Sequence, residues 1–477
     1  MALRLDLVYR QRRMPLRLSA RIFLVLLVPA ALLTAAERVT FSETIAPIVY
    51  ANCVTCHRPG EAAPFSLISY DDVKKRGPLI ATVTNSRSMP PWHAAHGFGE
   101  FADERRLSDA QVALIAEWVK QGMPEGDAAR MPKLPKFTDG WHLGKPDLVI
   151  EMPVGFELPA SGPDIYRNFV VPTKLTEDKW VRAVEFRPSA RKVVHHVLFA
   201  YDASGATRKL DGADGRPGFG GMSAIGVAGA GGNGGSLGGW AVGATPAFLP
   251  EGVALPLPKG SDIVLQMHFH LTGKPEVEKS VVGVYFADKA PERRVIPIQA
   301  PVLFGFGAGI DIAAGEKQFR IEDSLTLPAD VVAFSTGAHA HYIAKEMKAT
   351  ATLPDGTKQP LLWIPDWDFN WQDRYTYKSP VLLPKGTKID VSLLYDNSEG
   401  NHRNPNTPPK RVTWGEESFD EMGAVSLAVQ AVRKEDEPAL QQFIAERVKA
   451  AIAHAMRDGT LRRFQEKQQA GTAPRGQ

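Results

Sequence analysis

The chain has 477 residues, of which 44% are apolar and 23% are charged, and its formal net charge is +3. These values are typical of a globular protein with several domains, and they exclude a disordered, collagenous or polytopic membrane chain. The only two cysteines are Cys53 and Cys56. This spacing excludes a disulfide-stapled scaffold and a zinc module built on two CxxC pairs.

The first 36 residues have the layout of a secretory signal peptide. Six arginines between Arg4 and Arg21 precede the apolar run 22–33, and small residues follow at 34–36. The run holds 12 residues and is interrupted by Pro29, so it is shorter than the roughly 20 that cross a bilayer. We expect a periplasmic or secreted protein with no integral membrane span after cleavage; an uncleaved anchor is the alternative. No basic footprint points to nucleic acid.

Residues 53–57 read Cys-Val-Thr-Cys-His, the CxxCH attachment sequence of c-type haem. Both thiols would form thioethers to the porphyrin, and His57 would be the proximal iron ligand. A CxxC pair can also serve redox or zinc chemistry. The preceding export signal and the absence of a second cysteine pair favour covalently bound haem c.

The surroundings of this motif resemble a small class I cytochrome c domain. Residues 41–49 are expected to form an entry helix, and residues 108–119 a closing helix that begins at a serine cap and ends at Gly122. A soft sixth ligand to the iron is expected from the intervening loop, where Met89 lies between a serine and two prolines. His93 and His96 compete for this role, Met123 is a weaker candidate, and Met89 could instead fill a core gap.

Beyond residue 138, short β-branched and aromatic runs separated by Pro, Gly and Asp predict strands. About 300 residues of such pattern suit two β-sandwiches rather than one. A final amphipathic helix is expected from about 438 to 465. The expected strands are 149–152, 181–186, 193–201, 263–271, 280–286, 331–335 and 389–395.

Six of the twelve histidines fall in three tight pairs: His195 with His196, His268 with His270, and His339 with His341. Residues two apart in a strand project from one face, so the last two pairs are each half of a metal site. The adjacent pair would point to opposite faces of a regular strand, and joint ligation there requires a bulge or a strand end. For one pair a structural role is the more common explanation; three pairs together predict bound metal.

An ordered set of motifs resembles the copper type II, ascorbate-dependent monooxygenases, the family of peptidylglycine alpha-hydroxylating and dopamine beta-monooxygenases. The resemblance covers about residues 145–430 and rests on the stretches 195–201, 239–244, 264–270, 337–341, 367–372 and 420–422.

The resemblance implies two copper ions. His195, His196 and His268 resemble the ligands of the electron-transfer copper, and His270 could support them from behind. His339, His341 and Met422 resemble the catalytic copper site, where dioxygen is bound. Copper suits imidazole in both oxidation states and a thioether favours Cu(I), whereas zinc would gain little from Met422.

The sequence as a whole predicts a multidomain fold: a small all-α cytochrome c domain, two all-β sandwich (jelly-roll) domains and a C-terminal helix. The expected boundaries are 1–36 for the signal peptide, 38–130, 145–288 and 289–432 for the three domains, and 436–477 for the C-terminal helix and tail.

The predicted function is hydroxylation of a C–H bond with dioxygen, with electrons arriving through the fused haem from a redox partner or small reductant. A non-catalytic electron-transfer or copper-binding protein on the same fold is the alternative. The animal members are rich in disulfides, and this chain has no cysteine in the corresponding region. No counterpart to their substrate contacts is present, so the small-molecule substrate is not transferred.

Overall fold

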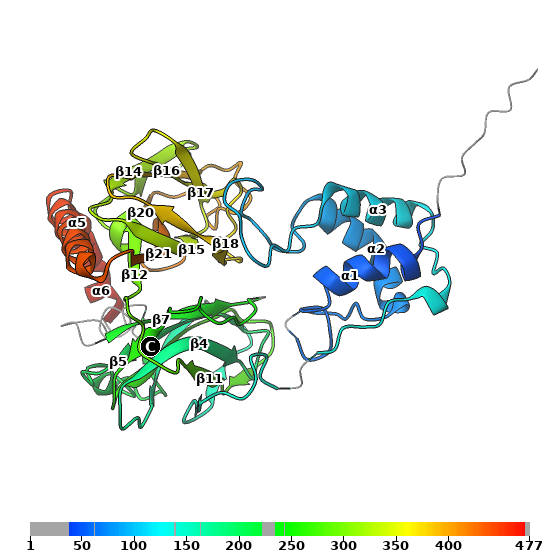
Figure 1. The fold of residues 1–477 in the computed structure, drawn as a ribbon, viewed down its shortest axis with the longest axis horizontal. Coiled ribbons are helices and arrows are strands. Elements are labelled where there is room, and N and C mark those ends of the chain that lie inside the picture. The colour runs from blue at the N-terminus through cyan, green and yellow to red at the C-terminus, as the bar shows by residue number, and fades with distance from the viewer. Residues whose placement is uncertain are drawn as a thin grey trace, which may run out of the picture. The chain divides into compact units, whose positions relative to one another are not determined.

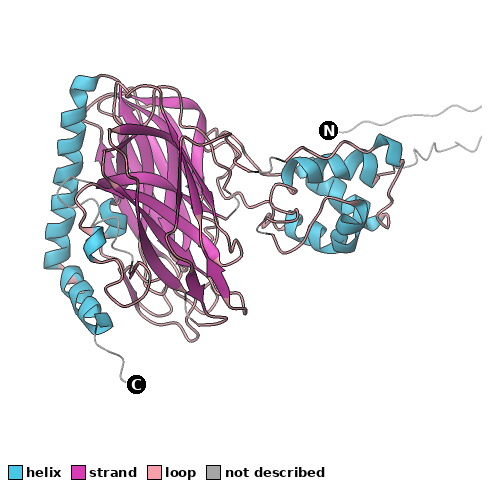
Figure 2. Ribbon diagram, turned by 90° about the horizontal axis from the view of Figure 1, so that it is seen from below, coloured by secondary structure: helices cyan, strands magenta, loops and turns pink. Residues whose placement is uncertain are grey.

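A computed structural model describes residues 38–472, except residues 62, 138–139, 163, 222–233 and 243. The predicted signal peptide, residues 1–36, lies outside the described residues. The described part forms 21 strands and five α-helices (Figures 1 and 2). Within it, no helix combines the length and the apolar character that crossing a bilayer requires.

The first group of sheets is built from residues 148–286. Its five-stranded antiparallel sheet has the order β6-β3-β9-β5-β7, and its four-stranded sheet has the order β1-β11-β4-β8. One apolar core contains side chains of both sheets, such as Phe199 and Val284. The strands are β1 (Leu148–Glu151), β2 (Phe156–Leu158), β3 (Ile165–Pro172), β4 (Lys179–Arg187), β5 (Val194–Asp202), β6 (Phe219–Gly220), β7 (Gly234–Ala241), β8 (Leu255–Leu257), β9 (Asp262–Phe269), β10 (Glu276–Glu278) and β11 (Val281–Phe286).

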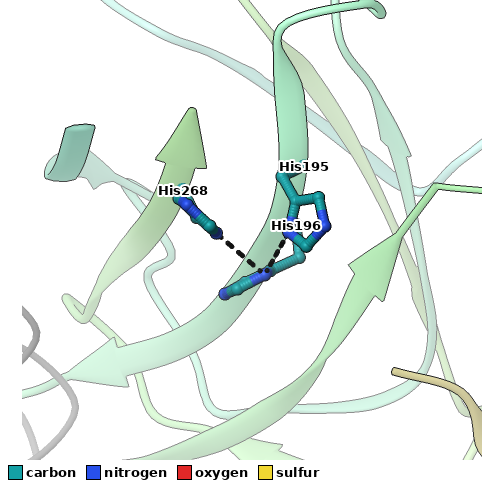
Figure 3. Close-up of side chains that lie close together, drawn as sticks. All are labelled: His195, His196 and His268. Atoms are coloured by element: carbon teal, nitrogen blue, oxygen red, sulfur yellow. Dashed lines mark hydrogen bonds between the residues drawn. The ribbon is translucent and has the colours of Figure 1, made fainter. Parts of the chain in front are cut away.

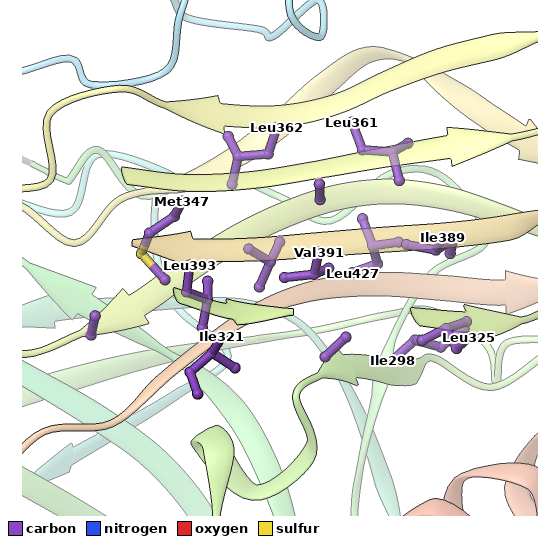
Figure 4. Packing of buried hydrophobic residues seen from close by; sticks show 14 of the residues in the cluster. Ile298, Ile321, Leu325, Met347, Leu361, Leu362, Ile389, Val391, Leu393 and Leu427 are labelled. Atoms are coloured by element: carbon purple, nitrogen blue, oxygen red, sulfur yellow. The ribbon is translucent and has the colours of Figure 1, made fainter. Parts of the chain in front are cut away.

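The second group of sheets is built from residues 296–431. Two four-stranded antiparallel sheets, β12-β21-β15-β18 and β14-β19-β16-β17, enclose the core drawn in Figure 4. Along β19 every second side chain is buried, because alternate residues of a strand face the core. The strands are β12 (Ile296–Ala300), β13 (Asp311–Ile312), β14 (Phe319–Thr326), β15 (Val331–Ala340), β16 (Ala344–Thr352), β17 (Lys358–Ile364), β18 (Arg374–Leu383), β19 (Lys388–Tyr395), β20 (Val412–Thr413) and β21 (Gly423–Ala431).

All seven stretches predicted as strands are strands, and their ends differ by a few residues from the expected ones. The longest difference is in β15, which extends to Ala340 rather than Ser335. The extension matters because it carries the backbone directly to the histidine pair that follows.

The helices α1 (Ala46–Asn52), α2 (Tyr70–Asn85) and α3 (Asp109–Lys120) pack around an apolar cluster of their own that includes Phe41, Ile115 and Trp118. Ser108 and Gln111 form the capping box at the start of α3, because each satisfies a backbone N–H of the first turn. A short turn of π-helix, Phe41–Ile45, leads into α1.

The loop between α2 and α3 belongs to the second core. Ala94 and Phe101 are buried there, and Phe101 pairs with Tyr377 of β18 as an isolated antiparallel bridge. The N–H of Ala102 donates to the carbonyl of Thr376 over 2.7 Å, and the N–H of Lys378 donates to Glu100 over 2.9 Å.

The predicted fold class is therefore wrong. Residues Val39–Gln477 form one compact, mostly β unit, and no small all-α cytochrome c domain separates from it. The physical reason lies in the loop between α2 and α3. Its apolar side chains Ala94 and Phe101 are buried in the core of the second group of sheets, and not among the helices.

The predicted single C-terminal helix is also corrected. The structure has two helices, α5 (Glu437–Arg457) and α6 (Thr460–Thr472). Gly459, with a φ of +79°, lies between them; this left-handed conformation ends a helix and costs glycine little. Figure 2 shows α5 beside the strands, and its Leu440 and Ala455 belong to the second core.

Candidate metal centres

Three histidines converge between two neighbouring strands of the first group. His195 and His196 lie on β5, and His268 lies on β9 (Figure 3). One nitrogen from each lies within 4.8 Å of the others. His268 is only 1% exposed because β9 is the buried central strand of its sheet. The structure thus brings together the three side chains predicted for the first copper.

A β-bulge allows the two adjacent histidines to face the same centre. Val194 pairs with Phe269 and His196 pairs with His268, so His195 is the extra residue between two ladder positions. Such an extra residue bends the strand and re-aims its side chains. The Nδ1 atoms of His195 and His196 consequently approach to 3.1 Å.

Asp164 orients His268 from behind. Its carboxylate lies 2.7 Å from Nε2 of His268, which leaves Nδ1 turned toward His196 at 3.4 Å. Tyr166 of β3 stacks on the same imidazole at a centroid distance of 4.3 Å. A carboxylate behind an imidazole fixes its tautomer and ring orientation, as in many metal sites.

His270 shares this carboxylate rather than joining the three histidines. Its Nδ1 lies 3.0 Å from the other oxygen of Asp164, and its side chain is 66% exposed. Burial alone would raise the pKa of Asp164, but the hydrogen bonds from His268 and His270 outweigh it and lower the pKa. The carboxylate is therefore ionised at neutral pH.

The imidazoles of β5 are held in the neutral form. Burial, reinforced by the charge of His268, lowers the pKa of His195 to about 4 and that of His196 well below its ordinary value. Nε2 of His195 is buried and makes no hydrogen bond with a described residue. A neutral imidazole with an unused nitrogen is the state that a metal ion requires.

The second candidate centre lies where β15 ends. The ring centroids of His339 and His341 are 5.3 Å apart. His339 pairs with Ala424 and Ala340 with Gly423 across the β15–β21 ladder, which ends there. His341 and Met422 are the next residues beyond this last pair, and the N–H groups of both donate to Glu421.

Hydrogen bonds occupy one ring nitrogen of each second-centre histidine. Nδ1 of His339 lies 2.6 Å from Oε1 of Gln372, and Nδ1 of His341 lies 3.1 Å from the carbonyl of Asp420. Nε2 of both rings is left available for a ligand. Burial lowers the pKa of both, that of His341 to about 3, so both rings are neutral at physiological pH.

Glu421 supports this centre through the backbone. Its buried carboxylate accepts the N–H of His341 at 2.5 Å, of Met422 at 2.9 Å and of Ile343 at 3.2 Å. Burial raises its pKa to about 8, although these three bonds oppose the rise. The side chain joins the end of β15 to the residue before β21.

Cys53, Cys56 and His57 follow α1 directly. The two thiols are not bonded to each other, and burial raises the pKa of both, that of Cys53 to about 12. Reactive redox cysteines have lowered pKa values, so the pair does not resemble a thiol–disulfide site. Nδ1 of His57 hydrogen-bonds the carbonyl of Phe65 at 3.1 Å, which leaves Nε2 as the nitrogen that could bind a ligand.

The candidates for the sixth iron ligand differ in their surroundings. Met89 is half-buried, and its N–H donates to the carbonyl of Val83. Nδ1 of His93 hydrogen-bonds the carbonyl of Asp366, while its Nε2 is buried without a hydrogen-bond partner among the described residues. His96 is largely exposed. Met123 belongs to the helical core.

Four residues that contact the candidate ligands were not predicted from the sequence: Asp164, Gln372, Glu421 and Phe369. The ring of Phe369 lies 5.8 Å from that of His195 and 5.8 Å from that of His341. Asp164 lies far from its histidines in the chain and gives no local signal. Gln372, Phe369 and Glu421 lie inside stretches that carried the family resemblance, and that position is the one sequence signal that could have found them.

No protein-family model and no curated protein matches this chain. Solved structures with some similarity include the VP2 subviral particle of infectious bursal disease virus, at 14% identity and a TM-score of 0.16 over 62% of this chain and 74% of that one. Another is the STIV MCP, at 9% identity and a TM-score of 0.18 over 52% of this chain and 95% of that one. Likenesses this weak carry no argument about fold or function.

Proposed function

We propose that this protein is a copper-dependent monooxygenase that hydroxylates a C–H bond of a small molecule with dioxygen. The observation that carries the proposal is the presence of two sets of histidines with ring nitrogens left for a metal, in which burial lowers the pKa of His195, His196, His339 and His341. His195, His196 and His268 form one set. His339 and His341 form the other, with Met422 just before the paired Gly423.

The donor set favours copper over other metals. All five imidazoles are compatible with copper in both oxidation states, and the thioether of Met422 favours Cu(I). The first set would hold the electron-transfer ion and the second the ion that binds dioxygen. Bound copper supplies the one-electron redox chemistry and oxygen activation that no side chain of this protein can supply.

The protein's own contribution is to fix the ligands before a metal arrives. Asp164 and Gln372 hold His268 and His339 in one ring orientation. Burial lowers the pKa of His195 to about 4 and that of His341 to about 3, so no proton has to leave these two rings when a metal binds near neutral pH.

A c-type haem on Cys53, Cys56 and His57 is the proposed source of electrons, with Met89 as the proposed sixth ligand. Two ion pairs join residues near the CxxCH motif to segments next to the histidine sets. Glu61 pairs with Arg191 over 2.5 Å, and Arg191 lies shortly before His195. Arg105, whose charge acts on Cys56, pairs with Asp373 over 2.5 Å, and Asp373 directly follows Gln372. Covalent tethering raises the effective concentration of the donor at the copper sites.

The cellular setting is proposed on the basis of the sequence alone. The basic and apolar N-terminal segment suggests export to the periplasm or beyond. A redox partner or small reductant there would reduce the haem, and neither nucleic acid nor an integral membrane span is part of the proposal.

Metal and haem analysis of protein from a host that matures c-type cytochromes tests the cofactors. We expect one haem and two coppers per chain. Oxygen uptake by the loaded protein with a panel of apolar and aromatic substrates, compared with Met422→Ala, then tests catalysis. Two coppers without any uptake in the wild type would instead identify a non-catalytic electron-transfer protein. Reduced haem that is not reoxidised on rapid mixing with oxygen would contradict the haem relay.

A further inference from the structure

Phe369 makes ring contacts with both histidine sets. Its centroid lies 5.8 Å from that of His195, with the two planes only 23° apart, and 6.2 Å from that of His268. It also lies 5.8 Å from the ring of His341, which it meets nearly at right angles. The phenyl ring is 3% exposed. One apolar side chain therefore contacts both candidate metal centres.

The loop that carries Phe369 is anchored to the histidines of the second centre. The amide nitrogen of Gln372 donates to the carbonyl of Phe369 at 3.1 Å, while Oε1 of the same side chain bonds His339. On the other side, the indole N–H of Trp367 donates to the carbonyl of His341 at 3.0 Å. The phenyl ring is thus fixed relative to His339 and His341.

A second contact joins the two centres independently of this loop. Tyr166, which stacks on His268, hydrogen-bonds through its hydroxyl to Ser418. Ser418 lies two residues before Asp420, whose carbonyl holds His341. Two separate contacts therefore join the histidine sets, one through Phe369 and one through Tyr166 and Ser418. These contacts, together with the covalent chain, fix the position of one set relative to the other.

The distances limit how far apart the two centres can be. The two 5.8 Å centroid separations, taken end to end, are the most that can lie between the rings of His195 and His341. A close-packed aromatic ring in this position occupies volume that water would otherwise fill.

We propose that Phe369 is a positioning residue that sets the separation of the two metal ions and keeps water from between them. This inference rests on the proposed function, because it requires a copper ion at each histidine set. It goes beyond that function in assigning a role to a side chain that binds no metal.

The test uses the full chain loaded with Cu(II) and reads the magnetic interaction between the two ions by continuous-wave EPR. The variant His196→Ala removes a ligand of the first centre, so its spectrum reports the second centre alone. The variant His339→Ala removes a ligand of the second centre, so its spectrum reports the first centre alone. We expect the wild-type spectrum to be broader than the sum of these two, because nearby paramagnetic ions couple through space. In Phe369→Ala, with two coppers still bound, this broadening should decrease, because only the contact between Tyr166 and Ser418 then joins the two sets, and deuterium from D₂O should appear in the copper echo modulation.

Phe419→Ala is the matched control. Phe419 is 59% exposed and packs on Tyr342, and Tyr342 in turn contacts Phe369. It should keep the wild-type broadening. Phe369→Leu keeps apolar bulk without the ring and should lose the broadening only in part, which allows a decision if the alanine variant does not fold. Fewer than two coppers in the wild type would contradict the proposed function as well. Two coppers with unchanged broadening and modulation in the Phe369 variants would overturn only the role of Phe369.

Discussion

Gln372 and His339 are joined by a hydrogen bond of 2.6 Å between the amide oxygen and Nδ1 of the imidazole. This bond sets the tautomer of His339 and turns Nε2 toward the second centre. Gln372→Ala is expected to weaken Cu(I) binding at that centre by roughly 10- to 100-fold, as for other residues that orient metal ligands. Competition titration with a colorimetric Cu(I) chelator measures the change.

Asn370→Ala is the matched control for Gln372, because the amide of Asn370 bonds Asp368 in the same loop and not a histidine. It should leave the copper affinity close to that of the wild type. Equal affinities in all three proteins would show that the bond to His339 has no part in metal binding.

The buried His341 predicts a particular pH dependence of stability in the metal-free protein. Its folded pKa, lowered by burial to about 3, is below the value of about 6.5 for the unfolded chain. Between these values the unfolded state binds a proton that the folded state does not, so stability is lost as the pH falls below about 6.5. We expect His341→Asn to reduce the slope by about 1.4 kcal/mol per pH unit between pH 6 and pH 4.

Urea unfolding of both proteins at several pH values measures this slope. Subtracting one protein from the other removes the contributions of other groups, such as Glu421, whose raised pKa acts in the opposite direction. Parallel curves for wild type and variant would mean that His341 is protonated in the folded protein.

Removing the carboxylate of Glu421 should destabilise the end of β15. In Glu421→Ala the N–H groups of His341, Met422 and Ile343 lose their acceptor, at a cost of about 1–3 kcal/mol for each buried group left unpaired. We expect a total loss of at least about 3 kcal/mol in urea unfolding. Glu417→Ala, in the loop just before, should change stability by less than about 0.5 kcal/mol. A small effect of Glu421→Ala would mean that water replaces the carboxylate.

Phe101 should stabilise the second core although it lies between two helices of the N-terminal segment. Its buried ring stacks on Tyr377 at 5.3 Å, and Phe101→Ala is expected to cost about 3–5 kcal/mol. The loss should appear in unfolding monitored by the tryptophans of β17 and its following loop. Phe419→Ala, which removes an exposed ring, should cost far less. Unfolding of the helices alone, with this signal unchanged, would favour an independent helical domain.

The sixth iron ligand can be assigned with three variants. With Met89 as ligand, Met89→Ala is expected to give a high-spin haem with a lowered reduction potential, because an axial thioether raises the potential. His93→Ala and His96→Ala should then leave the optical spectrum unchanged. A high-spin spectrum in His93→Ala alone would assign the bond to His93, whose Nε2 is buried without a partner.

The strands and the positions of the histidine pairs on them were the features most accessible from the sequence. Alternating burial produces a strand pattern that is visible locally, and the histidine pairs share a face by the two-residue period of a strand. The meeting of His196 and His268 follows from β5 and β9 being neighbours, which local pattern does not reveal. Asp164 was missed for the same reason, since it reaches His268 only through the pairing of β3 with β9.

The fold class was mispredicted because sequence pattern does not report where an apolar side chain is buried. Phe101 and Ala94 look like ordinary residues of a loop between helices. Their burial against Tyr377 and other residues of the second core depends on a contact between segments more than 250 residues apart. The CxxCH motif at residues 53–57 does not imply that the helices around it form a domain of their own.

The bulge in β5 makes the first candidate metal centre depend on the length of a strand as well as on its composition. His195 is the residue left unpaired between Val194 and His196 in the ladder with β9. Loss of a single residue there would restore a regular ladder and turn one of the two adjacent imidazoles to the opposite face of the sheet. A change of strand register by one residue would therefore separate the three imidazoles, even with every remaining side chain unchanged.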